Sequence, residues 1–397
     1  MWTKKPLSEV TTILSGGTPK SGVADYWGND IRWLTPKDMG RMSSKYISDS
    51  DRRISQLGLD KSSAKLILKN SVILSTRAPI GHLAINTEPM ATNQGCRGLI
   101  PKDNLDTKFL YYFLLGSVSL LNELGTGAIF KELSKTALES VVIPFPPIPE
   151  QQRIVAILDQ AFADIEKARA NAEQNLKNAH ELFDSYLQQV FSQRGEGWEK
   201  FSLGNITDVS SGGTPTKSTK EYWNGSMPWY SSGELNKLFT KPSKEMITDK
   251  GLKESNAKLF PAGSLLIGMY DTAALKMSLL DREGCFNQAI AGVKPNDKVN
   301  LVFIYHTINF LKPELLLLRR GVRQKNLNQS KIKSIPIGLP SIEEQNEVVL
   351  LLQSLQDQSD NLVGIYSQKL KSLDELKKSL LQKAFSGELT KSKGIAA

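Results

Sequence analysis

The chain has 397 residues and a formal net charge of +9, and 40% of its residues are hydrophobic and 23% are charged. This composition is typical of a globular protein and excludes an intrinsically disordered chain. Two cysteines are too few for a disulfide-rich secreted scaffold, and no apolar run is long enough for a membrane span or a signal peptide. We therefore expect a soluble, cytoplasmic protein of two or three domains, whose positive charge is a weak indication of nucleic-acid binding.

The sequence contains an internal repeat of about 195 residues. Ser-Gly-Gly-Thr-Pro occurs at 15–19 and again at 211–215, which is a shift of 196 residues. All six tryptophans pair between the two halves at this shift: Trp2 with Trp198, Trp27 with Trp223, and Trp33 with Trp229. Further along, at a shift of 194, Asn93-Gln94 matches Asn287-Gln288 and Glu150-Gln151 matches Glu344-Gln345. Such long copies predict one fold that is used twice.

Residues 1–149 combine short apolar runs with turn signals, which predicts a mixed α/β domain. Strands are expected at 65–68, 71–75, 83–85 and 140–143. A helix is expected from Thr107, as its N-cap, to Leu121, and its counterpart in the second copy from about Asn300 to Leu318. The proline-rich residues 144–149 predict a stiff extended linker after the domain.

Residues 150–193 contain no glycine or proline and predict one long helix. Apolar or small residues recur on it in heptad-like steps, at Ile154, Leu158, Ala161, Ile165, Ala168 and Ala172. Its 44 residues would span roughly 66 Å. Residues 344–390 repeat this pattern, with Gly364 as an expected interruption and Ser386-Gly387 as an end signal before a tail at 391–397. Because such a stripe needs a partner of equal length, we expect the two helices to pair antiparallel as a coiled coil.

The predicted architecture is therefore α/β (mixed α+β), with two similar globular domains, 1–149 and 194–343, separated by the two long helices in a pseudo-two-fold arrangement. Charge follows this division: the domains carry +5 and +7, whereas residues 150–193 carry −3 and residues 344–397 carry 0. Two basic domains on a spacer suit a DNA duplex that is read at two half-sites. The spacer would then set the distance between the half-sites.

Three motifs carry a resemblance to a known family. They are Ser-Gly-Gly-Thr-Pro followed by Tyr-Trp and a further Trp, Pro-Pro-Ile-Pro-Glu-Gln-Gln-Arg-Ile-Val at 146–155, and Leu-Leu-Gln-Lys-Ala-Phe-Ser-Gly-Glu-Leu-Thr at 380–390. Together they resemble the specificity (S) subunit of a type I restriction–modification enzyme, over essentially the whole chain.

The resemblance implies a non-catalytic subunit whose two target-recognition domains read a bipartite double-stranded DNA target. It also implies that the long helices dock two methyltransferase (modification) subunits, which form an adenine-N6 methyltransferase, and that motor–nuclease (restriction) subunits join the complex. S-adenosylmethionine, ATP and Mg would be bound by those partners. We expect no cofactor on this chain and no membrane.

The candidate DNA-binding residues lie in loops. Backbone N–H groups of a glycine turn can hold a phosphate beside a lysine, which selects Ser15, Gly16, Gly17, Thr18, Lys20, Ser211, Gly212, Gly213, Thr214 and Lys217. A cation- and amide-rich loop before Leu327 adds Arg320, Arg323, Gln324, Lys325 and Asn326, and its counterpart in the first copy adds Thr126 and Lys131. Arg77 follows an expected strand. The alternatives are a tight structural turn for the glycines and a solvated charge run for the basic loop.

Other features argue for structural roles. Trp27, Trp33, Trp223 and Trp229 are expected in the cores, and Asn93-Gln94 and Asn287-Gln288 are expected to fix a loop rather than read bases. The sequence lacks an Asp/Asn-Pro-Pro-aromatic methyltransferase motif, a Walker loop and a His-Glu-x-x-His motif, so no catalytic or metal site is expected. The cysteines are expected to be buried free thiols. A stand-alone DNA-modifying enzyme with an unrecognised site and a purely structural scaffold remain as alternatives.

Overall fold

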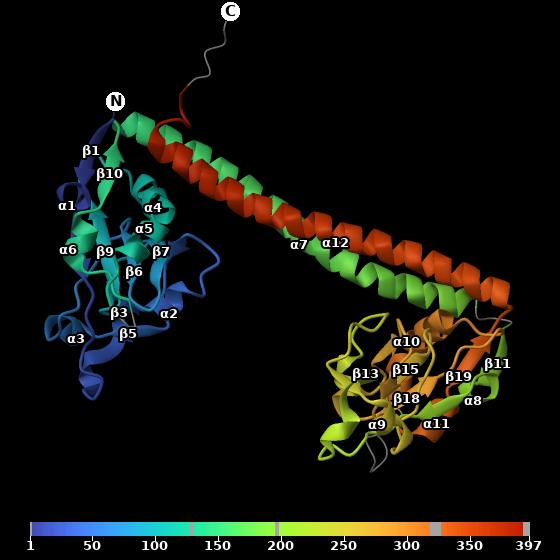
Figure 1. Cartoon of the computed structure of the whole chain (residues 1–397). Helices are drawn as coiled ribbons and strands as arrows, with labels where there is room; N and C mark the ends of the chain where they lie inside the picture. Colours follow the sequence, from blue (N-terminus) through green and yellow to red (C-terminus); the bar gives the residue numbers. More distant parts are fainter. Residues whose placement is uncertain (1, 128–130, 195–197, 318–326, 392–397) are drawn as a thin grey trace, which may run out of the picture. The chain divides into compact units, whose positions relative to one another are not determined.

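The structure is a computed structural model that describes residues 2–127, 131–194, 198–317 and 327–391. The chain divides into two compact units, which are Met1–Glu173 with Gln368–Ala397, and Gln174–Ser367. Each unit combines one α/β domain with one part of each long helix, and Figure 1 labels many of the elements. We refer to them as the first and the second unit.

The domain of the first unit is built on a five-stranded sheet with the strand order β2-β9-β6-β7-β4. A three-stranded sheet, β5-β3-β8, and the pair β1-β10 complete it. The strands are β1 (Thr3–Pro6), β2 (Thr11–Ser15), β3 (Trp27–Leu34), β4 (Tyr46–Ile47), β5 (Arg52–Ile54), β6 (Val72–Thr76), β7 (Ile80–Asn86), β8 (Ala91–Thr92), β9 (Cys96–Pro101) and β10 (Val142–Phe145). The helices are α1 (Leu7–Val10), η1 (Ala24–Tyr26), α2 (Pro36–Met39), α3 (Gln56–Asp60), α4 (Thr107–Gly116), α5 (Val118–Glu123), α6 (Lys135–Glu139) and the start of α7 (Ile148–Arg194).

The domain of the second unit repeats this plan with a four-stranded sheet, β12-β18-β15-β16, a three-stranded sheet, β14-β13-β17, and the pair β11-β19. The strands are β11 (Glu199–Ser202), β12 (Val209–Ser211), β13 (Trp223–Tyr230), β14 (Glu245–Ile247), β15 (Leu265–Gly268), β16 (Met277–Leu279), β17 (Cys285–Phe286), β18 (Ile290–Val293) and β19 (Pro336–Leu339). The helices are α8 (Leu203–Ile206), η2 (Lys220–Tyr222), η3 (Ser232–Glu234), α9 (Asp249–Lys253), η4 (Asp271–Ala273), α10 (Leu301–Leu317), α11 (Gln329–Lys333) and the start of α12 (Ile342–Ser386).

The strand registers of the two domains correspond residue by residue. Ser15 lies opposite Arg97 between β2 and β9, and Ser211 lies opposite Ala291 between β12 and β18. Likewise β3 pairs antiparallel with β5 and parallel with β8, as β13 does with β14 and β17. The prediction of one mixed α/β fold used twice is confirmed.

The long helices bury the predicted stripe, partly against the domains. In the first unit, Ile154, Leu158 and Ile165 of α7 share one core with the domain and with Leu381 of α12. Arg169 pairs with Asp374 there, and Glu166 accepts a hydrogen bond from Lys377 at 2.7 Å, so the two helices run antiparallel within this unit.

In the second unit, Leu187 and Val190 of α7 and Val348 and Leu352 of α12 enter the domain core. Between the helices, Ser359 donates to the carbonyl oxygen of Ala179 at 2.6 Å. The expectation that the stripe needs only a second helix was therefore incomplete, because each domain covers one end of it.

Two expected features of the long helices differ in the structure, and a third is confirmed. Residues 144–149 do not form an extended linker, because β10 runs to Phe145 and α7 starts at Ile148. A proline such as Pro149 is tolerated in the first turn of a helix, because a backbone N–H at that position would have no partner within the helix. Gly364 does not interrupt α12, which is continuous from Ile342 to Ser386. The predicted end is confirmed: Gly387 has φ +80° and the amide of Glu388 donates to Lys383 O at 3.1 Å.

Two expected elements of the first domain also differ. Residues 65–68 do not form a strand, because only Ile67 is bridged, to Met90, while its apolar neighbours Leu66 and Leu68 are exposed. The helix at 107–121 is two helices that break at Ser117, and its N-cap is Asp106, whose carboxylate accepts from the amide of Phe109 at 3.0 Å.

A buried glutamine attaches each long helix to its domain. Gln151 is fully buried, donates to Asn104 O and Pro146 O at 2.9 and 2.8 Å, and accepts from the amide of Asp106 at 2.9 Å. Gln345 is equally buried in the second unit and makes the same three kinds of bond, to Lys298 O, Pro340 O and the amide of Asn300. The repeated Glu-Gln pair thus contains a structural joint between helix and domain.

Gln151→Leu should lower the free energy of unfolding by about 3 kcal/mol, because three backbone groups would lose their buried partner. Gln345→Leu should act equally on the second unit. Gln152→Leu is the matched control, since Gln152 is exposed, and should change stability by less than about 0.5 kcal/mol. Chemical denaturation measures the free energy of unfolding of each variant. Equal losses of stability in Q151L and Q152L would contradict the structural role of Gln151.

The two units differ where α4 and α10 face the long helices. In the first unit the carboxylate of Asp159 accepts hydrogen bonds from Lys45, Lys108 and Tyr112. Burial opposes ionisation of Asp159, but these hydrogen bonds outweigh it and hold its pKa below the usual range.

His306 of α10 is the counterpart of Tyr112 at the repeat shift of 194. It is buried beside the rings of Phe183 and Tyr305, and burial lowers its pKa to about 4.

The second unit should therefore lose stability in mild acid. His306 stays neutral in the folded chain down to about pH 4, whereas an unfolded histidine takes up a proton below about pH 6.5. The contribution of neutral His306 to the free energy of unfolding is fully present above pH 6.5 and should fall by roughly 2–3 kcal/mol as the pH drops towards 4. His306→Phe should remove this pH dependence, and His180→Gln, at an exposed site, should keep it. Denaturant unfolding between pH 7 and 4 measures the difference.

Candidate nucleic-acid interface

The predicted DNA-binding residues of the first domain lie at one edge of its main sheet. β2 ends at Ser15, β9 begins at Cys96, β6 ends at Thr76 and β7 begins at Ile80. Because these neighbours are antiparallel, all four strand ends meet at the same edge, which we call the loop edge. The loops that follow carry the candidates Ser15 to Lys20 and Arg77.

Side-chain contacts join the candidates at this edge. Arg97 donates to the hydroxyl of Ser15, and the guanidinium of Arg77 lies 3.3 Å from the carboxylate of Glu132. Glu132 in turn exchanges backbone hydrogen bonds with Thr126, at 3.0 and 2.8 Å. Lys131 donates to the carbonyl oxygen of Asn122 at 3.4 Å and is exposed. Three candidate segments far apart in the sequence are thus neighbours.

The Ser-Gly-Gly-Thr-Pro loop is held by the domain itself. The amides of Gly16 and Gly17 donate to Cys96 O and Thr92 O, so in this structure both are engaged by the protein. A Cβ at Gly16 would lie 1.9 Å from Asn93 O, which leaves room for glycine alone. A phosphate at this loop would therefore depend on the exposed side chains of Thr18 and Lys20.

Two tryptophans bracket the same loop from its carbonyl side. The indole of Trp33 donates to Gly17 O at 2.9 Å and that of Trp27 to Lys20 O at 3.3 Å. The second unit repeats both bonds, from Trp229 to Gly213 O at 3.0 Å and from Trp223 to Thr216 O at 3.2 Å. Trp33 and Trp229 are buried, as expected, and the outer tryptophans are half-buried.

The repeated Asn-Gln pair fixes the facing loop, in agreement with its expected role. Asn93 accepts from the amide of Gly95 at 3.0 Å, and Gln94 accepts from the hydroxyl of Thr18. In the second unit Asn287 accepts from Ala289 N at 3.1 Å, and Gln288 accepts from Thr214. The parts that recur in both copies therefore form the framework of the loop edge.

A cation lies over the outer tryptophan in both units, but it comes from different places. Arg52 of β5 lies 3.7 Å above the ring of Trp27. In the second unit Glu245 occupies the register position of Arg52 and pairs with Lys217, which lies 3.7 Å above Trp223. The candidate Lys217 is thus placed beside the loop, whereas Arg52 was missed because a lone arginine in a strand has no motif.

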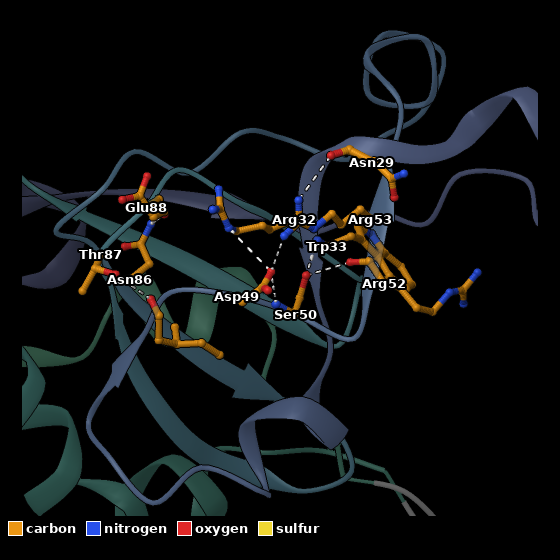
Figure 2. Close-up of polar contacts among 11 residues, drawn as sticks. Asn29, Arg32, Trp33, Asp49, Ser50, Arg52, Arg53, Asn86, Thr87 and Glu88 are labelled. Carbon is orange, nitrogen blue, oxygen red and sulfur yellow. Dashed lines mark hydrogen bonds and ion pairs between the residues drawn. The ribbon is translucent and has the colours of Figure 1, made fainter.

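Sequence reasoning also missed an arginine cluster of the first domain (Figure 2). Arg32 and Arg53 lie opposite each other on β3 and β5, and both approach the carboxylate of Asp49, at 3.7 and 2.9 Å. Hydrogen bonds from the Ser50 amide and from Arg53 hold the pKa of Asp49 below its usual range. Ser50 also accepts from the amide of Trp33 at 2.9 Å, which ties the cluster to the tryptophan bracket.

The remaining candidates of the second domain divide into two groups. Ser211 to Lys217 lie at the corresponding edge, where Ser211 donates to Gln329 at 3.0 Å. Arg320, Arg323, Gln324, Lys325 and Asn326 lie outside the described residues. Leu327, which follows them, donates to Met269 O at 2.9 Å, as Leu133 does to Thr76 O. Because both units make this bond, Leu327 lies at the loop edge of the second domain, as Leu133 does in the first.

The described part of the chain holds no group of three or more His, Cys, Asp or Glu side chains arranged to bind a metal ion. Cys96 and Cys285 are buried free thiols, as expected, and burial raises the pKa of Cys285 to about 12. Within the same residues, none of the helices has the length and apolar character needed to cross a membrane.

The fold and the loop edges together describe a class of protein with two copies of one α/β domain, each attached to a long helix. The chain matches the family described as "Type I restriction modification DNA specificity domain" over residues 1–174 and 195–371. It therefore belongs to the type I restriction–modification specificity family, which confirms the expected resemblance and the role of a specificity subunit in DNA target recognition.

Individual relatives agree with this assignment. The type I restriction enzyme MjaIX specificity subunit of Methanocaldococcus jannaschii is 28% identical, over 98% of this chain and 93% of the relative. The EcoR124I/EcoR124II specificity subunit of Escherichia coli is 29% identical, over 68% of this chain and 67% of the relative.

Solved structures share the fold. A chain solved in work on complex assembly and conformational transition of the type I R-M system has a TM-score of 0.75 at 19% identity and covers 98% of both chains. The HsdS subunit from Thermoanaerobacter tengcongensis has a TM-score of 0.69 at 19% identity and covers 98% of this chain and 97% of that one.

Trp33→Phe should loosen the glycine loop of the first unit alone, because Gly17 O would lose its indole donor while an aromatic ring remains. We expect a loss of about 1–3 kcal/mol and faster amide exchange in residues 12–20. Trp229→Phe is the reciprocal control and should affect residues 208–216 instead. Hydrogen exchange read by mass spectrometry tests both variants, and changes in both loops from one variant would contradict the bracket.

Proposed function

We propose that this specificity subunit reads a bipartite double-stranded DNA target, with one half contacted by residues 1–149 and the other by residues 194–343. The observation that carries the proposal is that the two loop edges share one framework but differ in the charged side chains mounted on it. A shared framework with different side chains suits two related readers of two different short sequences.

The differences are concentrated in arginines. At five positions where the first domain has an arginine, the equivalent position of the second domain holds an uncharged or acidic residue. The pairs are Arg32 and Pro228, Arg52 and Glu245, Arg53 and Met246, Arg77 and Tyr270, and Arg97 and Ala291. In the second copy arginines instead gather in the sequence at 319, 320 and 323. Because arginine is the side chain that most often contacts guanine and phosphate, different target halves would follow from this difference.

We further propose that the long helices are spacers that dock two methyltransferase subunits, and that motor–nuclease subunits join the same complex. Exposed apolar side chains on α12 that neither domain core uses support such docking, above all Leu350, whose side chain is 68% exposed, and Ile365, which is 51% exposed. Catalysis would then belong to the partners, which would bind S-adenosylmethionine, ATP and Mg. In this proposal the chain itself contributes recognition and positioning.

Variants of one domain should change one half of the target. With the complex of chain and methyltransferase subunits, selection from a random duplex library should yield two short specific sequences around an unspecified spacer. Arg52→Ala with Arg53→Ala should relax only one of them, and Arg320→Ala with Arg323→Ala and Lys325→Ala only the other. Methylation of the host genome, read by single-molecule sequencing with the chain present and deleted, gives the reference motif. One continuous motif, or changes in both halves from either variant, would contradict the proposal.

A further inference from the structure

The loop edge of the first domain holds a buried arginine that forms no ion pair with a carboxylate in the part of the chain that the structure describes. Arg97 of β9 is 8% exposed, and its Nε is buried without a hydrogen-bond partner. Among the described residues, its side chain donates one hydrogen bond, to the hydroxyl of Ser15, and burial lowers its pKa. A buried cation with a single neutral partner is costly, so this position needs an explanation beyond packing.

The charged groups around Arg97 leave an excess of one positive charge. Arg77 stands at the same edge and pairs with Glu132 at 3.3 Å, and Glu139 is paired with Lys135 at 3.5 Å. Both carboxylates raise the pKa of Arg97 and Arg77 lowers it, so all three groups lie close enough to act on it. Because each carboxylate already pairs with another cation, three cations (Arg77, Arg97 and Lys135) share two anions, which leaves room for one further negative charge, as carried by a phosphodiester.

Glu132 shows where an anion is accepted at this edge. Its backbone is fixed by bonds to Thr126, but its side chain is 43% exposed and meets Arg77, which is 39% exposed, at the surface. Such a contact is weak and open to exchange. Guanidinium groups bind carboxylate and phosphate oxygens through the same planar donors, so a phosphate can replace this carboxylate.

We infer that Arg77 and Arg97 form a binding site for one DNA backbone phosphate, in which the carboxylate of Glu132 holds the place of the phosphate until DNA displaces it. The inference deepens the proposed function, on which it rests. The site belongs to the first domain alone, because the second domain has Tyr270 and Ala291 at these positions and Ser211 bonds to Gln329 instead.

The site can be tested without knowledge of the target, because a phosphate contact is independent of sequence. Anisotropy titrations use the full chain with its methyltransferase subunits and a random 40-base-pair duplex between 50 and 200 mM salt. Arg77→Gln and Arg97→Gln should each weaken binding by about 5–10-fold and reduce the slope of log K against log salt by about 0.9, the value for one phosphate. Circular dichroism checks that each variant is folded. If R97Q does not fold, the DNA affinities of R77Q and of the Glu132 variant test the inference.

Glu132→Gln should strengthen binding by about 3–10-fold, because no carboxylate then competes with the phosphate. Glu123→Gln is the matched control: it changes the net charge equally, at an exposed position whose side chain contacts Ser119 rather than an arginine. It should change affinity by less than about twofold, and the gain from E132Q should disappear in the R77Q background.

Three results would overturn the inference. They are an unchanged salt slope in folded R77Q, an equal gain from E123Q and E132Q, and a loss confined to one base pair of the selected target, which would indicate base contact instead. If the wild-type complex binds no duplex even at 50 mM salt, the proposed function itself fails, so the two failures are distinguishable.

Discussion

A fully buried glutamine fixes the start of each long helix on its domain, and the apolar contacts between helix and domain are built on that joint. A buried amide that satisfies two carbonyl oxygens and one amide fixes both the start of the helix and the loop before α4 or α10. An apolar contact would tolerate sliding, whereas three directed bonds define one geometry. In our proposal, reading two target halves at a set spacing would need such a joint, because any freedom between helix and domain would be passed on to the loop edge.

The same logic organises the loop edge itself. The motifs that recur in both copies, Ser-Gly-Gly-Thr-Pro, the tryptophans and Asn-Gln, bond mainly to one another: indole to carbonyl, threonine to glutamine, asparagine to backbone. The side chains that differ are mounted on this framework, such as Arg52 against Glu245 and Arg97 against Ala291. In our proposal, the repeated residues therefore form the framework, and the residues that differ between the copies are the ones that contact DNA.

This division explains how far the sequence could predict the molecule. The repeat and the heptad-like stripe predicted two domains and two long helices, since both are periodic signals that tertiary context rarely overrides. The start of α7 was misjudged because proline suits a first helical turn as well as a linker, and the helix at 107–121 because nothing local announces the break at Ser117. Arg97 and Glu132 could not be linked to Ser15 and Arg77, because strand register alone brings them together.

Carboxylates accompany most arginines of the first domain: Asp49 joins Arg32 and Arg53, Asp51 joins Arg41, and Glu132 joins Arg77. Without Asp49, the like charges of Arg32 and Arg53, which lie opposite each other on β3 and β5, would have no shared anion, and such a pair destabilises a sheet. The carboxylates thus allow a folded domain to carry many arginines close together, but each one also competes with a DNA phosphate. In our proposal this competition is useful. It lowers the affinity for arbitrary DNA, so that stable binding requires enough contacts to displace several carboxylates at once, and only a target that fits both halves supplies them.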